Sequence, residues 1–149
     1  MKRILTTLFA FALMILFMQS NANAQLTGTK TIPGDYATLL AAITDLNTNG
    51  VGGGGVIFNI APGYTETIPS GGYTINVLSN PPGPGNPVTI QRNGAGTNPL
   101  FSSSAGGSGT IAGTGLGTNG DAFLKLVGTD NVTITNINFT ENYTGGTTS

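Results

Sequence analysis

The amino-acid sequence predicts an all-β protein that starts a parallel β-helix, or solenoid, behind one N-terminal capping α-helix. Three observations support this fold class. Short β-branched runs recur between clusters of glycine, asparagine and proline. Residues 34–50 have the apolar spacing of an amphipathic helix. Residues 131–139 read as two short strands that meet at a corner.

Residues 1–24 are predicted to be a secretory signal peptide. Lys2 and Arg3 give a positive start, residues 4–18 are almost entirely apolar, and Ala22 and Ala24 form a small-residue cleavage site. A membrane anchor is the alternative, but the apolar run is shorter than the ~20 residues that a helix needs to cross a bilayer. We therefore expect a protein that is secreted, extracellular or on the outer cell surface, without a stable membrane span after cleavage.

The expected mature part, residues 25–149, is a single domain at most. It keeps three basic residues against six acidic ones, and it has no cysteine. A nucleic-acid partner is therefore not expected, because phosphate binding requires clustered Lys and Arg. Without disulfides, stability must come from backbone ladders and buried apolar rows.

The strands are predicted from runs of β-branched and aromatic residues that end in turn residues. These runs lie at residues 56–60, 73–78, 88–90, 123–127 and 132–134. Only residues 81–87 and 102–120 have so few apolar side chains that disorder remains an alternative there.

The single helix is predicted between an N-cap at Asp35 and a left-handed ending at Gly50. Its expected apolar face consists of Leu39, Leu40, Ile43 and Leu46. A helix followed only by strands is well placed to cover the open end of a β-stack. Packing on the side of an ordinary sheet is the alternative.

The corner is predicted at Asn136. Side chains alternate between the two faces of a strand. In a single continuous strand, Val132 and Ile134 would therefore point to one face, and Ile137 and Phe139 to the other. A bend between the two pairs is needed for both to point inward. Asparagine tolerates the left-handed backbone of a tight corner. A strand with a bulge, or a hairpin, is the alternative.

Several stretches resemble known families. "TIPGDYATLLAAITDLNTNG" followed by "GVIFNIAPGYTETI" resembles the opening of pectin-lyase-like right-handed β-helices. "NPVTIQRNGAGTNPLF" and "DAFLKLVGTDNVTITNINFTEN" are similar to the N-terminal region of large bacterial surface proteins of the type IX secretion kind. The resemblance covers nearly all of residues 26–142. It implies a right-handed β-helix with more coils, further modules and a C-terminal sorting domain.

The number of coils predicts a truncated domain. Residues 56–78, 88–112 and 123–139 supply about three coils, and repeat stacks need at least about three plus caps. We therefore expect residues 25–149 to be the N-terminal cap and first coils of a longer β-helix. The last coil would then expose a strand edge that is open to self-association.

The sequence contains no pattern that identifies catalytic, cofactor-binding or metal-binding residues. Asp121, Asp130 and Glu141 are near one another in sequence, but the first two stand in turn contexts. Arg92 either balances these carboxylates or lies on a solvated face. The resemblance covers only the N-terminal part of the β-helix of pectinolytic enzymes and includes none of their catalytic motifs. The absence of histidine excludes a Ser-His-Asp triad.

Three further patterns are weak. "GLGTNGD" at residues 115–121 lacks the several oxygen ligands of a calcium loop. Asn131, Asn138 and Asn142 match the glycan acceptor pattern, as expected in a Thr- and Asn-rich stretch. The glycines from Gly52 to Gly55 are expected to form a loop, because the ending of a phosphate-binding motif is missing.

Three functions remain open. The favoured one is a non-enzymatic, adhesin-like surface scaffold whose Thr- and Asn-rich faces bind extracellular polysaccharide. The second is the N-terminal part of a polysaccharide lyase or hydrolase whose active site lies in downstream coils. The third is a truncated product without independent function. None of the three implies a cofactor in residues 25–149.

Overall fold

The computed structural model describes residues 24–69, 71–103 and 122–140, so the predicted signal peptide lies outside the described residues, apart from Ala24. The one helix within these ranges is α2 (Leu39–Asn49). The strands are β1 (Leu26–Ile32), β2 (Val51–Ile60), β3 (Thr65–Ile68), β4 (Tyr73–Ile75), β5 (Val88–Arg92), β6 (Leu100–Ser103), β7 (Leu124–Leu126), β8 (Val132–Thr135) and β9 (Asn138–Thr140). No helix in the described ranges is long and apolar enough to cross a membrane.

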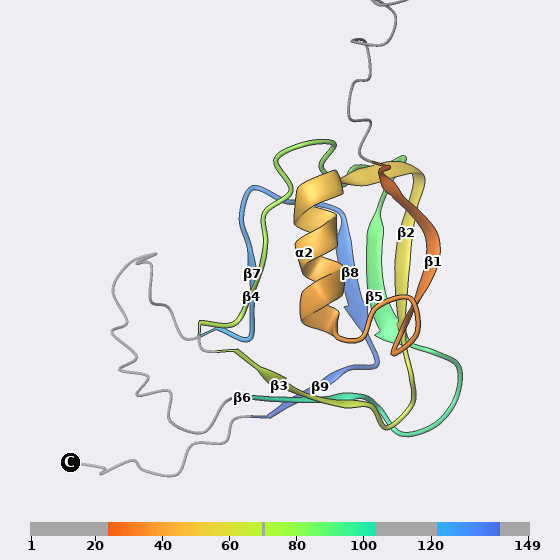
Figure 1. The fold of residues 1–149 in the computed structure, drawn as a ribbon, viewed down its shortest axis with the longest axis vertical. Helices are drawn as coiled ribbons and strands as arrows, with labels where there is room; N and C mark the ends of the chain where they lie inside the picture. The colour runs from red at the N-terminus through yellow and green to blue at the C-terminus, as the bar shows by residue number, and fades with distance from the viewer. Residues whose placement is uncertain (1–23, 70, 104–121, 141–149) are drawn as a thin grey trace, which may run out of the picture.

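The strands form three parallel sheets. The first sheet has the order β1-β2-β5-β8, the second β3-β6-β9, and the third β4-β7. The chain visits them in the same order on each pass, through β2, β3 and β4, then β5, β6 and β7, then β8 and β9. Figure 1 shows β1, β2, β5 and β8 side by side, whereas the strands of the other two sheets overlap in this view. For the described part of the chain, the prediction of an all-β protein with parallel sheets and one helix is confirmed.

Equivalent side chains from successive passes lie in register and form the core. Val88 pairs with Val56 on one side and with Val132 on the other. Phe101 pairs with Phe139, and their ring centroids are 5.9 Å apart. The inward positions of β2 and β5 are buried, and Phe58 is fully so. Apolar rows that continue from pass to pass therefore stabilise the three sheets together.

The helix α2 lies within the outline that the three sheets form, as Figure 1 shows. Its buried side chains are Leu39, Ala42, Ile43 and Leu46, and they belong to the same core as the strands. The predicted inclusion of Leu40 in this face is wrong, because 42% of that residue is exposed. Ala42 takes its place, since position i+3 from Leu39 lies on the buried stripe.

The helix ends where the sequence predicts, but it begins later. Gly50 has φ 70°, and its N–H donates to the carbonyl of Leu46 at 2.9 Å. The predicted N-cap at Asp35 is wrong. Thr38 is the N-cap, and its Oγ1 accepts a hydrogen bond from the N–H of Ala41 at 3.1 Å. Asp35 instead bonds to Thr31, a residue of β1.

The predicted corner at Asn136 is confirmed. Its φ is 56°, and the chain leaves β8 in the first sheet and enters β9 in the second. Both strands pair in parallel with the previous pass, so the alternative of a hairpin is wrong. Ile137 packs partly buried against the core, whereas 38% of Ile134 and 37% of Phe139 are exposed at the end of the stack.

The prediction of a loop at Gly52 to Gly55 is wrong, because these residues belong to β2. A Cβ on Gly55 would lie 2.3 Å from the carbonyl oxygen of Pro87, so the neighbouring chain approaches too closely for any side chain. Residues 81–87 form a turn held by Asn86, whose Nδ2 donates to the carbonyl of Pro81 at 3.0 Å. Gly52 and Gly55 thus allow neighbouring chain to approach closely, whereas a Cβ on Gly53 or Gly54 would meet no atom within 4 Å.

Candidate functional site

The outer face of the first sheet carries two rows of side chains in register across four strands. The first row is Thr29, Ile57, Thr89 and Thr133, and the second row is Thr31, Asn59, Gln91 and Thr135. All of these residues are partly or well exposed, and none of the eight is charged. Adjacent strands lie about 4.8 Å apart, so the rows extend along the stack with a regular spacing.

The amides of Gln91 and Asn59 are joined in the middle of the second row. The Gln91 Nε2 donates to the Asn59 Oδ1 at 2.9 Å. Each amide group carries two donor hydrogens and an acceptor oxygen with two lone pairs. One bond between them leaves further donors and acceptors, and this part of the surface can bind groups that both donate and accept hydrogen bonds.

One carboxylate lies beside the β1 end of the second row. The Oδ2 of Asp35 accepts hydrogen bonds from the N–H of Thr31 at 2.7 Å and from its Oγ1 at 3.0 Å. The backbone and side-chain hydrogen bonds from Thr31 lower the pKa of Asp35. The carboxylate is thus a structural partner of β1 and stays ionised at neutral pH.

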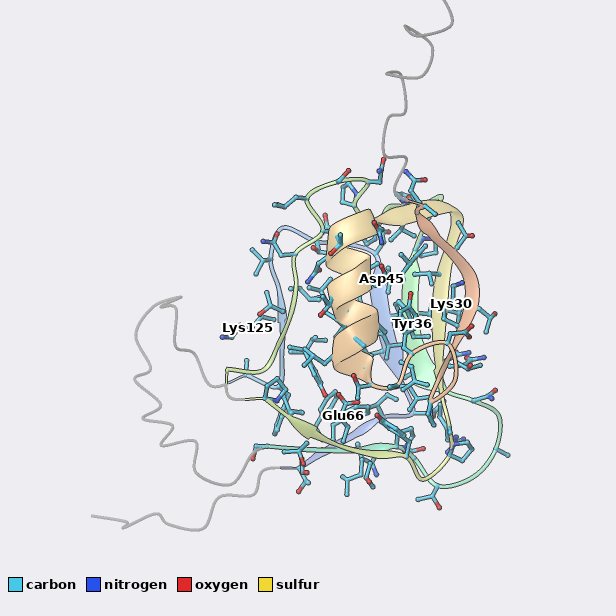
Figure 2. The ribbon with its side chains drawn as sticks, viewed as in Figure 1. Lys30, Tyr36, Asp45, Glu66 and Lys125 are labelled. Carbon is cyan, nitrogen blue, oxygen red and sulfur yellow. The ribbon has the colours of Figure 1, made fainter. Side chains whose placement is uncertain are left out.

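Glu66 forms the densest polar cluster in the described part of the chain. Its Oε2 accepts hydrogen bonds from the N–H of Leu39 and from the Tyr64 hydroxyl, both at 2.8 Å. Its Oε1 accepts from the Tyr73 hydroxyl at 2.8 Å and from the N–H of Leu40 at 3.3 Å. Figure 2 shows Glu66 beneath the first turn of α2. A carboxylate at this position complements the positive end of the helix dipole.

The Glu66 cluster also determines the protonation of its two tyrosines. Burial, and then the hydrogen bond to the Glu66 carboxylate, raise the pKa of Tyr64 and of Tyr73 above the ordinary value. Neither hydroxyl is therefore a base or nucleophile near neutral pH. The carboxylate accepts hydrogen bonds from four donors, and this cluster fastens α2 to β3.

A second polar cluster lies on the other side of the helix. The Tyr36 hydroxyl donates to Asp45 of α2, and the Nδ2 of Asn49 donates to the same carboxylate. The pKa of Tyr36 is raised mainly by burial of its hydroxyl, and further by its hydrogen bond to the Asp45 carboxylate. The Tyr36 ring meets Phe58 edge to face at 6.0 Å. Figure 2 shows Tyr36 and Lys30 on the β1 side of α2.

Arg92 organises the turn that follows β5. Its guanidinium donates to the carbonyls of Gly94 and Gly96 and to the Oδ1 of Asn98, at 2.9, 2.5 and 2.6 Å. The Asn98 Nδ2 then donates to the Oδ1 of Asn138 at 3.1 Å, so the network reaches the next pass. Arg92 thus has a structural role in this turn.

Of the acidic residues singled out in the sequence, the structure describes only Asp130. Asp130 is exposed, whereas Asp121 and Glu141 lie outside the described residues, as does the segment 115–121. Within the described ranges, no group of three acidic side chains is arranged to hold a metal ion.

The described glycan-acceptor asparagines have structural roles. Asn131 has φ 55°, and its carbonyl accepts from the N–H of Val88 at 3.0 Å. Asn138 contributes its side chain to the Arg92 network. Asn142 lies outside the described residues.

Sequence reasoning missed the role of Glu66 and the amide pair on the first sheet. Glu66 was visible only as part of the "PGYTE" turn, since its partners in α2 are more than twenty residues away. Gln91 and Asn59 are 32 residues apart. The signal for the outer rows is the alternation of polar with apolar residues in "VIFNI", "VTIQR" and "VTIT".

Comparisons with protein-family models, with characterised proteins and with solved structures found no match to this chain.

Proposed function

We propose that this chain forms the capped start of a right-handed parallel β-helix and acts as a non-enzymatic extracellular or cell-surface scaffold that binds a neutral polysaccharide. Two passes through the same three sheets in the same order, and a third through the first two of these sheets, support the coiled architecture. The right-handed sense follows from the strong preference of parallel crossover connections for that hand. The position of α2 within the sheet outline supports its role as a cap.

The outer face of the first sheet is the proposed binding surface. The observation that carries this proposal is the uncharged pair of rows, with the Gln91–Asn59 amide pair in the second row and Ile57 in the first. Sugar hydroxyls donate and accept hydrogen bonds, as amide and Thr side chains do. A sheet face presents no deep cavity of the kind that encloses small ligands, so it suits a polymer lying along it.

The absence of charge on the eight positions of the two rows favours a neutral polymer over an acidic one. Binding the carboxylates of a uronate chain would require basic groups among these rows. The exposed Ile57 provides an apolar patch for the C–H groups of a sugar ring. The predicted signal peptide supports export of the chain to the extracellular space, where such polysaccharides are found.

Affinity electrophoresis tests the proposed function. The protein is run through gels that contain a soluble neutral β-glucan, and through gels that contain polygalacturonate. We expect retardation by the neutral polymer only, and loss of retardation in the double variant Asn59→Ala with Gln91→Ala. Thr67→Ala, on an exposed position of the second sheet, is the control and should migrate like the parent. Unretarded parent protein, or retardation by polygalacturonate alone, would contradict the proposal.

A further inference from the structure

The described part of the chain contains two asparagines that are followed directly by glycine, Asn49 and Asn93. Such a pair can react with itself, because glycine has no Cβ that would hinder the approach of its backbone nitrogen to the preceding side chain. When the nitrogen attacks the side-chain amide carbon, Cγ, a five-membered succinimide ring forms. The structure gives the two pairs opposite surroundings.

The Asn49–Gly50 pair is protected at both reacting groups. The N–H of Gly50 donates to the carbonyl of Leu46 at 2.9 Å, so the nitrogen must lose this hydrogen bond before it can attack. The Nδ2 of Asn49 donates to the Asp45 carboxylate. Gly50 is also buried, and a Cβ there would lie 2.1 Å from the carbonyl oxygen of Ser79. This pair therefore reacts only when the end of α2 opens locally.

The Asn93–Gly94 pair lacks this protection. Both residues are exposed in the bend that follows β5. The N–H of Asn93 donates to the carbonyl of Ile60 at 2.7 Å, but neither the Asn93 side-chain amide nor the Gly94 N–H has a hydrogen-bond partner among the described residues. A Cβ on Gly94 would meet no atom within 4 Å, so there is room for a ring to close.

Arg92 lies beside the reacting nitrogen and leaves it free. Its Nε donates to the carbonyl of Gly94 at 2.9 Å, and its Nη1 donates to the carbonyl of Gly96 at 2.5 Å. These hydrogen bonds engage backbone oxygens of the bend and not the Gly94 nitrogen. The nitrogen must lose its proton to attack, and a nearby guanidinium favours the negative charge that then forms.

We propose that Asn93 is a site of spontaneous deamidation, with water as the co-reactant. The Gly94 nitrogen gives its proton to hydroxide and bonds to the Cγ of Asn93. The bond from Cγ to Nδ2 then breaks, and Nδ2 takes a proton from water and leaves as ammonia. Water adds to either carbonyl carbon of the succinimide and opens the ring, and no atom is oxidised or reduced.

The two ways of opening the ring give two products. One is aspartate at position 93, and the other is isoaspartate, in which the main chain runs through the former side chain. Either product replaces a neutral amide with a carboxylate in an exposed bend. The modification does not depend on polysaccharide binding by the outer face of the first sheet.

Peptide mapping by mass spectrometry tests this proposal. Trypsin cleaves after Lys30, Arg92 and Lys125, so the two pairs lie in different peptides, 31–92 and 93–125. Folded protein is incubated in mildly alkaline buffer, and the mass increase from the exchange of NH2 for OH is followed in each peptide. Fragment ions identify the asparagine that has reacted, which separates Asn93 from Asn119 in the second peptide.

We expect Asn93 to convert at least about tenfold faster than Asn49 in the folded protein, since Asn49 reacts only after local opening breaks its hydrogen bonds. The same incubation in guanidinium chloride is the control for sequence effects. Unfolding removes the bonds to Leu46 and Asp45, so the two asparagines should then convert at similar rates.

Asn93→Gln is the matched variant, because glutamine would need a six-membered ring and should stay unmodified at this position. Circular dichroism checks that the variant is folded. An unmodified Asn93 in the parent protein, equal conversion of the two asparagines in the folded state, or a rate ratio that is just as large in guanidinium chloride would overturn the proposal.

Discussion

The Oε2 of Glu66 lies 2.8 Å from the backbone nitrogen of Leu39, so that a carboxylate from β3 binds the first turn of α2. The first N–H groups of a helix have no partner inside the helix. Thr38 satisfies one of them, and Glu66 satisfies those of Leu39 and Leu40. The helix is thereby joined to the second sheet through hydrogen bonds as well as through its apolar face.

Glu66→Gln should lower the free energy of unfolding by about 1–3 kcal/mol, because an amide replaces one accepting oxygen with a donor that faces other donors. Urea denaturation followed by circular dichroism measures this change. Asp130→Asn removes the same charge at an exposed position and should have little effect. Equal stabilities of the Glu66 variant and the parent would show that the cluster does not hold the helix.

Stability should decrease as the pH rises above about 10, where tyrosines of the unfolded chain ionise. The folded state raises the pKa of Tyr36, Tyr64 and Tyr73, so it retains protons that the unfolded chain loses. The stabilising contribution is fully present below the unfolded pKa and is lost as the pH rises through the folded values. An alkaline titration followed by phenolate absorbance should show that these three hydroxyls do not ionise near pH 10 while the protein is folded. Titration of all four tyrosines at that pH in folded protein would refute this prediction.

Ile43→Asp should prevent folding or cause aggregation, because the side chain is only 2% exposed and an unpaired charge would be buried in the core. Leu40→Asp in the same helix is the control, and it should leave the protein soluble with nearly the parent melting temperature. Thermal melts and size-exclusion chromatography distinguish the two variants. Similar behaviour of both would mean that the helix does not bury the face described above.

Asn136→Val should destabilise the protein by about 1–2 kcal/mol, because a β-branched residue resists the left-handed backbone at this corner. Asn136→Gly should be tolerated, since glycine adopts φ of 56° without steric strain. The midpoint of denaturation of the two variants gives the comparison. An unchanged midpoint for the valine variant would contradict the corner between β8 and β9.

The strands with alternating β-branched residues were predictable from the sequence, and so was the corner at Asn136. Strands β1, β3 and β6 were not, because short or polar segments such as "LTGTKTI" have little intrinsic strand signal. They become strands through register with a neighbouring strand, as Ile32 does beside Ile60. Residues 52–55 likewise belong to β2 although a run of glycines has little strand signal, and at Gly55 the neighbouring Pro87 lies too close for a side chain.

The candidate site was less predictable than the fold. Aspartate is a common N-cap residue, but the carboxylate of Asp35 accepts hydrogen bonds from Thr31, and Thr38 is the N-cap of α2. Local spacing could not distinguish these two roles, because they depend on where the loop after β1 turns. The Gln91–Asn59 contact depends on the register of β2 with β5, which no local pattern specifies.

Nuclear magnetic resonance on isotope-labelled protein most directly tests the central claim, that successive passes stack in parallel register around one core. The proposed polysaccharide surface depends on this arrangement. We predict nuclear Overhauser contacts between the methyl groups of Val88 and Val132 and between the rings of Phe101 and Phe139, with backbone contacts of the parallel type from β5 to β8. An antiparallel pattern between β5 and β8, or the absence of contacts between those two pairs, would contradict the account.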